Sequence, residues 1–260
     1  MIDTLLCDID GTLLHRGAAL PGAAAALRAA RDAGLGIRLL TNITAKTPHE
    51  LATQLGTEGI EVEADEIQTA TTACISFLLA NPGKRCHLIV PDGVRAAFEP
   101  VEIDDVHPDF VVIGDIGDGF DYATLNRAFR MLRGGARLVA LQKNLFWLDA
   151  EGERLDCGAF VIGLEAAAGI RAIVTGKPSP VFFEAALRQL GASAQGAVVI
   201  GDDIATDMAG ARAIGAHALH VRTGKHRPEW LEQHRESIDS VLDSIADLPS
   251  WLDRVRVRSA

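Results

Sequence analysis

Two aspartates end an apolar run near the start of the chain, in the segment LLCDIDGTLL at residues 5–14. Side chains at alternate positions of an extended strand point to the same side, so Asp8 and Asp10 are expected to face one site. Gly11 allows a sharp turn there, and the Thr12 hydroxyl can fix that turn. Two carboxylates this close repel one another, which favours a bound cation or a retained proton. For this pair alone, a strand that ends in an ordinary polar turn is the alternative interpretation.

Three further apolar, strand-like runs also end in polar side chains. They span residues 37–42, 172–180 and 197–207, and the polar residues that they carry are Thr41, Asn42, Lys177, Asp202, Asp203 and Asp207. The carboxyl ends of parallel strands in an open α/β sheet lie at one edge, where such sheets bind ligands. Four strands would thus bring carboxylates, a hydroxyl, an amide and one ammonium group to a single place, and chance is a poor explanation of that convergence.

The elements that must position these residues alternate along the chain. Strand-like and helix-like patterns follow one another throughout, which predicts an α/β fold with a mostly parallel sheet and covering helices. The expected helices lie at residues 21–33, 47–55, 71–80, 94–99, 122–133, 158–169, 180–190, 208–214 and 248–255. Besides the four runs above, the expected strands lie at 66–69, 87–90, 110–114, 137–141, 218–221 and 240–242.

The turn Asn-Pro-Gly at residues 81–83 is the expected exit from the first domain, because the alternation of strands and helices starts afresh after it. The earlier pattern resumes at about residue 172. We therefore predict a core domain formed by residues 1–82 and 173–260 and an inserted domain at 83–172, joined by short hinges.

With these motifs in place, the chain resembles the haloacid dehalogenase (HAD) superfamily of phosphatases, whose four sequence motifs occur here in order. The length between Asn42 and Lys177 resembles the NagD-like subgroup, in which a large α/β cap (type C2, IIA) is inserted at that point. The stretches FRMLRGGARLVAL, GKPSPVFFEAALRQLG, GDDIATDMAGARAIG and VRTGKHRP resemble the branch of the phospholysine phosphohistidine inorganic pyrophosphate phosphatases. The resemblance covers nearly the whole chain and implies a Rossmann-like, parallel-sheet core with helices on both faces.

The resemblance also implies a role for the acidic motif residues. Asp8 would be the nucleophile that forms an aspartyl-phosphate, and Asp10 would protonate the leaving group and later activate water. Mg²⁺ would be held by the carboxylates of Asp8 and Asp202 and by the backbone carbonyl of Asp10, which are all hard oxygen ligands. Some animal members of the nearest branch carry Ser at the position of Asp10, so this chain keeps an acid–base carboxylate that they lack.

The remaining motif residues would support the phosphoryl group and its ligands. Lys177 would offset the negative charge, while the Thr41 hydroxyl, the Asn42 backbone and amides of the turn at Gly11 would hold phosphate oxygens. Around them, Asp207 would orient Lys177 or a metal-bound water, and Asp203 and Thr12 would lie just outside the ligand set.

By the same resemblance, substrate selection lies in the segment LQKNLFWLDAEGE of the inserted domain. Lys143, Asn144, Phe146 and Trp147 are the expected contacts, with Lys143 and Trp147 foremost. The alternatives are that the two aromatic side chains pack the inserted domain and that Lys143 is a solvated surface residue.

The composition of the chain limits which partners and which cellular location are expected. The net charge of −10 over 260 residues makes nucleic acid an unexpected partner. Neither a secretory signal nor an apolar run of membrane-spanning length occurs, and the four cysteines show no CxxC spacing, so we expect a cytoplasmic protein with reduced thiols. Relatives with this type of cap pair through it, which implies a homodimer.

The sequence thus predicts a magnesium-dependent phosphatase of small phosphorylated metabolites. Phosphohistidine, phospholysine or pyrophosphate are the substrates that the nearest branch favours. A sugar or nucleotide monophosphate, pyridoxal phosphate and 2-phosphoglycolate remain open. Two other classes are a non-enzymatic phospho-binding regulatory module, which would need neither a second aspartate nor an inserted domain, and a dehalogenase, which would require neither Asp10 nor Asp202.

Overall fold

The chain folds into two compact units in a computed structural model that describes residues 2–148 and 153–257. The core unit comprises Met1–Thr41, Pro48–Gln68 and Lys177–Ala260, and the inserted unit comprises Asn42–Thr47 and Thr69–Gly176. This division groups residues by compactness, and the functional bounds 1–82, 83–172 and 173–260 stay a prediction.

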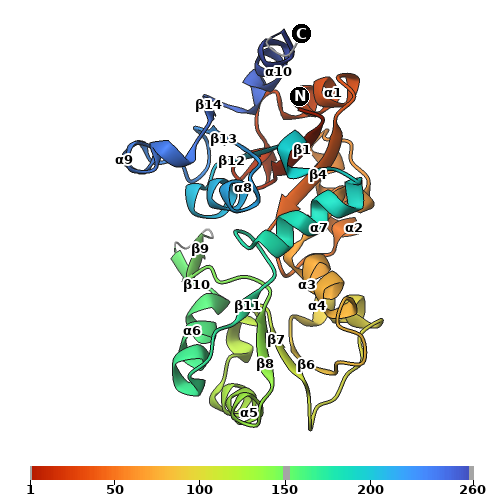
Figure 1. Ribbon diagram of the computed structural model, residues 1–260, viewed down its shortest axis with the longest axis vertical. Helices are drawn as coiled ribbons and strands as arrows, with labels where there is room; N and C mark the ends of the chain where they lie inside the picture. The colour runs from red at the N-terminus through yellow and green to blue at the C-terminus, as the bar shows by residue number, and fades with distance from the viewer. Residues whose placement is uncertain (1, 149–152, 258–260) are drawn as a thin grey trace. The chain divides into compact units, whose positions relative to one another are not determined.

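The core unit is built on a sheet with the strand order β14-β13-β12-β1-β4-β5 (Figure 1). Its strands are β1 (Thr4–Asp8), β4 (Gly36–Thr41), β5 (Ile67–Thr69), β12 (Ala197–Gly201), β13 (His217–Val221) and β14 (Ser240–Leu242). The pairs from β14 to β4 are parallel. Every residue of β1 and β12 is buried, as expected of central strands that are covered on both faces.

Helices cover both faces of this sheet. The helices of the core unit are α1 (Ala23–Asp32), α2 (Pro48–Thr57), α7 (Pro180–Leu190), α8 (Ala209–Ile214), α9 (Pro228–Gln233) and α10 (Leu248–Val257). The chain leaves β1 toward β4 in one direction and later runs from β12 to β13 in the other, and right-handed crossovers then place α1 and α8 on opposite faces. The carboxyl ends of β1 and β12 flank the point where the direction reverses, the usual ligand crevice of such sheets.

The inserted unit has a smaller parallel sheet with the order β11-β8-β7-β6. Its strands are β6 (Cys86–Ile89), β7 (Phe110–Ile113), β8 (Arg137–Ala140) and β11 (Ile173–Val174), its helices are α3 (Ala70–Leu79), α4 (Asp92–Arg95), α5 (Tyr122–Arg133) and α6 (Cys157–Ala168), and β9 (Phe146–Leu148) pairs with β10 (Glu153–Leu155). Alternate residues face opposite sides: Val112 packs with α3, whereas Val111 packs with α5 and α6.

These observations confirm the predicted α/β class, with helices on both faces of a parallel sheet. Two hairpins were not predicted: β9–β10, and the short pair of β2 (Leu14–His15) with β3 (Ala18–Ala19). The helix expected at 94–99 is divided into α4 and a 3-10 turn at Ala96–Phe98.

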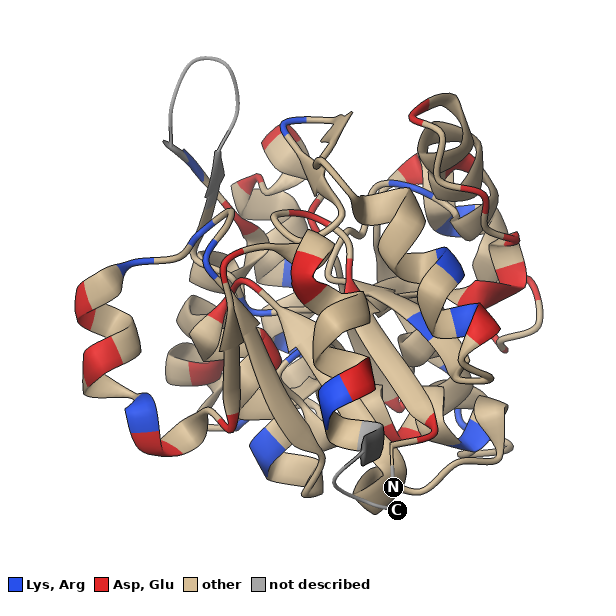
Figure 2. Ribbon diagram, turned by 90° about the horizontal axis from the view of Figure 1, so that it is seen from above, with Lys and Arg blue, Asp and Glu red and all other residues tan. Residues whose placement is uncertain are grey.

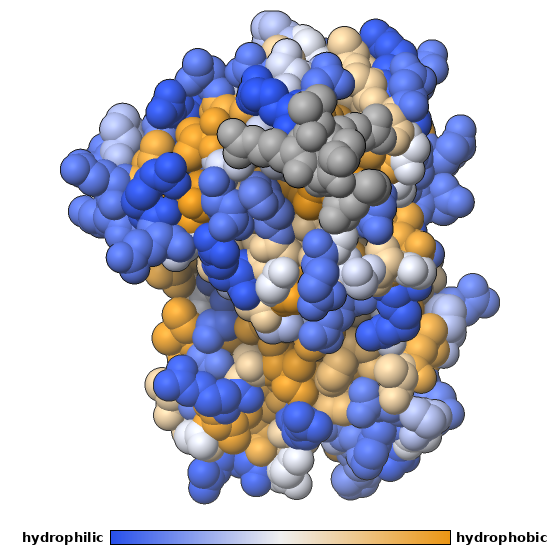
Figure 3. Space-filling view, turned by 45° about the horizontal axis from the view of Figure 1, so that its top comes forward, coloured by the Kyte–Doolittle hydropathy of each residue, from blue (hydrophilic) through white to orange (hydrophobic). Residues whose placement is uncertain are grey.

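The surface mixes charged, polar and apolar residues, whereas the cysteines lie in the interior. Acidic and basic residues are interspersed over the helices (Figure 2), and hydrophilic and hydrophobic residues are mixed on the face shown in Figure 3. All four cysteines are free and buried. Within the described ranges, no helix combines the length and apolar character that crossing a membrane requires.

Candidate active site

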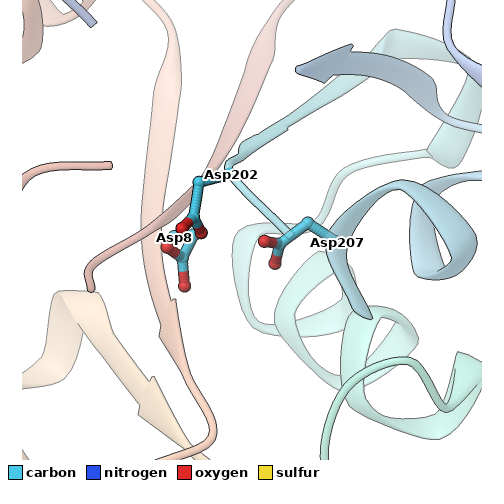
Figure 4. Close-up of side chains that lie close together, drawn as sticks. All are labelled: Asp8, Asp202 and Asp207. Carbon is cyan, nitrogen blue, oxygen red and sulfur yellow. The ribbon is translucent and has the colours of Figure 1, made fainter. Parts of the chain in front are cut away.

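Adjacent strands of the core unit place the two central aspartates side by side. In the parallel pairing of β1 with β12, Cys7 lies opposite Ile200, so Asp8 ends its strand where Asp202 follows the next one. Figure 4 shows the Asp8 and Asp202 carboxylates next to one another, with the Asp207 carboxylate directed toward them. One carboxylate oxygen from each of the three aspartates lies within 4.8 Å of the others.

Lys177 joins two of these aspartates. Its Nζ lies 2.5 Å from Asp8 Oδ1 and 2.7 Å from Asp207 Oδ1, and all three side chains are buried. Burial alone lowers the pKa of Lys177, but the charges of Asp207 and Asp8 outweigh it and hold that pKa well above the usual value. The ammonium group therefore stays charged at physiological pH. The predicted meeting of Asp8 with Lys177, and of Lys177 with Asp207, is present in the structure.

The three carboxylates carry more negative charge than Lys177 can offset. Burial, followed by the charges of Asp8 and Asp207, raises the pKa of Asp202 to about 8. Burial is also the main cause that raises the pKa of Asp207 to about 7. Buried carboxylates with a raised pKa are stabilised by a proton or by a cation, and their oxygens are the donors that Mg²⁺ prefers. The donor set of Asp8 and Asp202 thus fits a divalent ion.

The turn after β1 fixes Asp8. The Thr12 hydroxyl donates to Asp8 Oδ2 at 3.0 Å. Burial raises the pKa of Asp8, and the charge of Lys177 is the chief opposing effect. The amide of Gly11 donates to Leu14 O at 2.6 Å within this turn, and phosphate binding by amides of the turn stays a prediction. Asp10 is exposed on the same turn, within reach of solvent.

Asp203 has a different environment from Asp202. Its carboxylate pairs with Lys225 Nζ at 2.9 Å and accepts from the amide of Ala205 at 2.9 Å. Burial raises the pKa of Asp203, but the Lys225 charge and these hydrogen bonds together hold it below the usual value. The backbone N–H of Asp203 donates to Asp207 Oδ2 at 3.2 Å, so Asp203 orients the partner of Lys177 and lies outside the carboxylate cluster.

The two phosphate contacts that were predicted at the carboxyl end of β4 belong to different units. Thr41 is the buried last residue of β4 in the core unit. Asn42 belongs to the inserted unit, where its side-chain oxygen lies so close to Gly176 that a β-carbon at that glycine would overlap it.

The predicted substrate contacts lie in the inserted unit. Lys143 Nζ pairs with the buried Glu165 of α6, at 3.1 Å from Oε1 and 2.9 Å from Oε2. This ion pair gives Lys143 a structural partner, which the sequence did not indicate. Phe146 is half exposed, and the side chain of Trp147 lies outside the described residues.

Sequence reasoning missed the loop at residues 223–225. Thr223 Oγ1 donates to Gly11 O at 2.5 Å, and the Lys225 backbone N–H donates to Asp202 Oδ2 at 2.6 Å. The available signal was position: the loop follows β13, whose carboxyl end lies at the same edge of the sheet as those of β12 and β1.

Comparison with known proteins identifies the family. Residues 5–104 match the model of the haloacid dehalogenase-like hydrolases, and residues 174–248 match that of the HAD-hydrolase-like proteins. The human phospholysine phosphohistidine inorganic pyrophosphate phosphatase is 38% identical over 249 residues, which cover 94% of this chain and 91% of the relative. The human haloacid dehalogenase-like hydrolase domain-containing protein 2 is 38% identical over 87% of this chain and 86% of its own.

Similarity to solved structures supports the same family. NagD from E. coli K-12 superimposes with a TM-score of 0.86 at 29% identity, covering 95% of this chain and 98% of its own. The 4-nitrophenylphosphatase of Thermotoga maritima gives a TM-score of 0.89 at 25% identity, covering 96% of this chain and 97% of its own. These similarities confirm the prediction of an enzyme that hydrolyses phosphate esters over that of a phospho-binding module. The chain therefore belongs to the haloacid dehalogenase-like hydrolases and is a phosphatase of their NagD-like group.

Proposed function

We propose that this phosphatase is magnesium-dependent and hydrolyses small phosphorylated metabolites through a phosphoaspartate at Asp8. The observation that carries the proposal is the buried contact of Asp8 with Lys177, 2.5 Å long, within the carboxylate cluster of Asp202 and Asp207. A charged ammonium beside Asp8 favours the ionised carboxylate that a nucleophile requires.

In the first step, a carboxylate oxygen of Asp8 forms a bond to phosphorus while the bond from phosphorus to the leaving group breaks. Asp10, which is exposed next to the turn, gives its proton to the departing oxygen or nitrogen. In the second step, Asp10 takes a proton from water, and the water oxygen attacks the phosphorus of the phosphoaspartate. The bond from Asp8 to phosphorus then breaks, which releases inorganic phosphate and restores both acids.

Other groups neutralise and orient the phosphoryl group. Lys177, held between Asp8 and Asp207, offsets negative charge as the phosphoryl group transfers. The Thr41 hydroxyl and the backbone of Asn42 would bind phosphate oxygens. When bound, Mg²⁺ would be held by Asp8, Asp202 and the Asp10 carbonyl, and it would supply further charge neutralisation for the phosphoryl group.

The relatives support a substrate class. The phosphatases of phospholysine, phosphohistidine and inorganic pyrophosphate are 38% identical over nearly the whole chain, which favours substrates with a phosphorus–nitrogen or phosphoanhydride bond. Sugar and nucleotide monophosphates, pyridoxal phosphate and 2-phosphoglycolate are the alternatives. Lys143 and Trp147 of the inserted unit are the proposed selecting residues. A homodimer through that unit and a cytoplasmic location remain predictions.

The experiment is phosphate release from each of these compounds, with and without Mg²⁺, for the wild type and Asp8→Asn. We expect activity only with Mg²⁺, highest on the nitrogen- or anhydride-linked phosphates, and a loss of at least about 10³-fold in Asp8→Asn because the nucleophile is removed. Radiolabelled substrate quenched in acid should leave label on the wild type and none on the variant.

The exposed Asp32 on α1 provides a matched control, since Asp32→Asn makes the same chemical change away from the site. Its activity should equal that of the wild type. Near-native turnover by Asp8→Asn with unchanged Mg²⁺ dependence would rule out the phosphoaspartate.

A further inference from the structure

The loop at residues 223–225 makes three contacts, one with the turn after β1 and two with the aspartates that follow β12. The Thr223 hydroxyl donates to Gly11 O at 2.5 Å, the Lys225 backbone N–H donates to Asp202 Oδ2 at 2.6 Å, and Lys225 Nζ pairs with Asp203 Oδ2 at 2.9 Å. The loop therefore connects the turn after β1 with the two aspartates that follow β12. None of these contacts involves the nucleophile.

Two glycines enclose the same oxygen of Asp202. Gly224 and Gly11 both have positive φ, of +54° and +96°, and a β-carbon at either position would overlap Asp202 Oδ2. A β-carbon at Gly224 would also lie 2.6 Å from Gly11 Cα. Asp202 Oδ2 thus sits between two glycines and one backbone amide, and no larger residue fits at either glycine without displacing the carboxylate.

We propose that the 223–225 loop restricts Asp202 to binding a metal ion through Oδ1 alone and thereby sets the preference of the site for Mg²⁺ over Ca²⁺. This inference rests on the proposed function, because it concerns a ligand of the proposed metal. Mg²⁺ requires a compact octahedral shell, whereas Ca²⁺ accepts more ligands and carboxylates that bind through both oxygens. With Oδ2 bound to the Lys225 amide, the two-oxygen mode that suits Ca²⁺ is disfavoured. Thr223, Gly224 and Lys225 are in this sense positioning residues.

The experiment is direct titration calorimetry of the metal-free full chain with Mg²⁺ and with Ca²⁺, without substrate. Gly224→Ala should weaken Mg²⁺ binding by about tenfold, as displacement of a packed carboxylate would cause, and should weaken Ca²⁺ binding less. Thr223→Val removes only the hydrogen bond to Gly11. It should weaken Mg²⁺ binding by about threefold and should again weaken Ca²⁺ binding less. The ratio of the two dissociation constants is the readout that a general loss of stability would not move.

Gly191→Ala is the matched control. Gly191 also lies in the core unit with a positive φ of +63°, but nothing would lie within 4 Å of its β-carbon, so the substitution brings the same backbone strain without the overlap. Its ion preference should equal that of the wild type. Circular dichroism establishes folding, and Thr223→Val carries the test if Gly224→Ala fails to fold.

Two failures are distinguishable. If the wild type binds no Mg²⁺, the metal site of the proposed function is wrong. If the wild type binds Mg²⁺ but the loop variants keep its preference over Ca²⁺, the role given to the loop is overturned.

Discussion

Three carboxylates at the centre of the site share one ammonium group. Lys177 contacts Asp8 and Asp207, whereas Asp202 accepts a hydrogen bond from the backbone amide of Lys225. With all four groups ionised, three negative charges and one positive charge leave a local charge of −2. A buried excess of this size is costly, which explains why the site needs a cation or retained protons before it can accept a phosphate.

Replacement of the exposed Asp10 separates proton transfer from nucleophilic attack. In Asp10→Asn, kcat should fall by about 10²–10⁴-fold for alkyl phosphates, whose leaving oxygen must be protonated, and far less for 4-nitrophenyl phosphate. Steady-state kinetics on the two substrates measure the difference. Because Asp10 is exposed, thermal unfolding should be close to that of the wild type. Equal losses on both substrates would count against the acid role.

Residue types at the ends of apolar runs predicted the central contacts of the site. Asp8, Lys177 and Asp202 come from distant parts of the sequence, and the structure brings them together as their strand positions indicated. The contacts that were missed involve the main chain: the Lys225 amide on Asp202 and the Gly11 amide on Leu14 O. Backbone groups are the same in every residue, so a sequence carries no direct sign of where they point.

At the scale of elements, the packing of α8 against α7 depends on one glycine. A β-carbon at Gly210 would overlap the ring of the fully buried Phe183. We expect Gly210→Ala to lower the free energy of unfolding by about 1–3 kcal/mol, because the new methyl group overlaps a buried ring that must shift. Urea unfolding followed by circular dichroism measures this change.

Gly163 on α6 is the matched control, because nothing would lie within 4 Å of its β-carbon. Gly163→Ala should stabilise the protein by about 0.5–1 kcal/mol through the higher helix propensity of alanine. Equal effects of the two substitutions would show that the contact with Phe183 is not what constrains Gly210.

Segments with a strong apolar periodicity predicted the bounds of their helices well, whereas segments with a weak periodicity did not. The helices at Tyr122–Arg133 and Pro180–Leu190 begin and end as predicted. The segment before α8 differs, since a π-helical turn at Ile204–Met208 precedes it. The Asp203 side chain accepts a hydrogen bond from the Ala205 amide and so caps the start of this turn. The spacing of apolar residues in the sequence does not reveal such a local contact. The short hairpins were missed because their strands are two or three residues long.

At the scale of the whole molecule, we expect the carboxylate cluster to couple stability to pH and to the proposed Mg²⁺. Burial raises the pKa of Asp202 from 3.8 to about 8. An acid whose pKa is raised on folding binds protons more tightly in the folded chain than in the unfolded chain. Its contribution to the stability of the metal-free protein therefore falls as the pH rises from about 4 to about 8. Mg²⁺ bound to the ionised form, as proposed above, would oppose that loss.

Saturating Mg²⁺ should therefore raise Tm by about 5 °C at pH 8 and by clearly less at pH 6, where protons compete for the same oxygens. Thermal unfolding at both pH values measures the shift. The metal-free Asp202→Asn protein should be more stable than the wild type at pH 8 and should show little response to Mg²⁺. A Tm shift that is the same at both pH values would contradict the coupling.

The placement of the thiols has a consequence for the conditions that this phosphatase tolerates. All four cysteines are buried, and burial raises the pKa of Cys7, beside the proposed nucleophile, well above its usual value. Peroxide and alkylating reagents attack thiols that are exposed and ionised, and the cysteines of this fold are neither exposed nor readily ionised. With the proposed Asp8 nucleophile and all four thiols buried, this phosphatase should therefore keep its activity in peroxide that inactivates phosphatases dependent on a reactive cysteine.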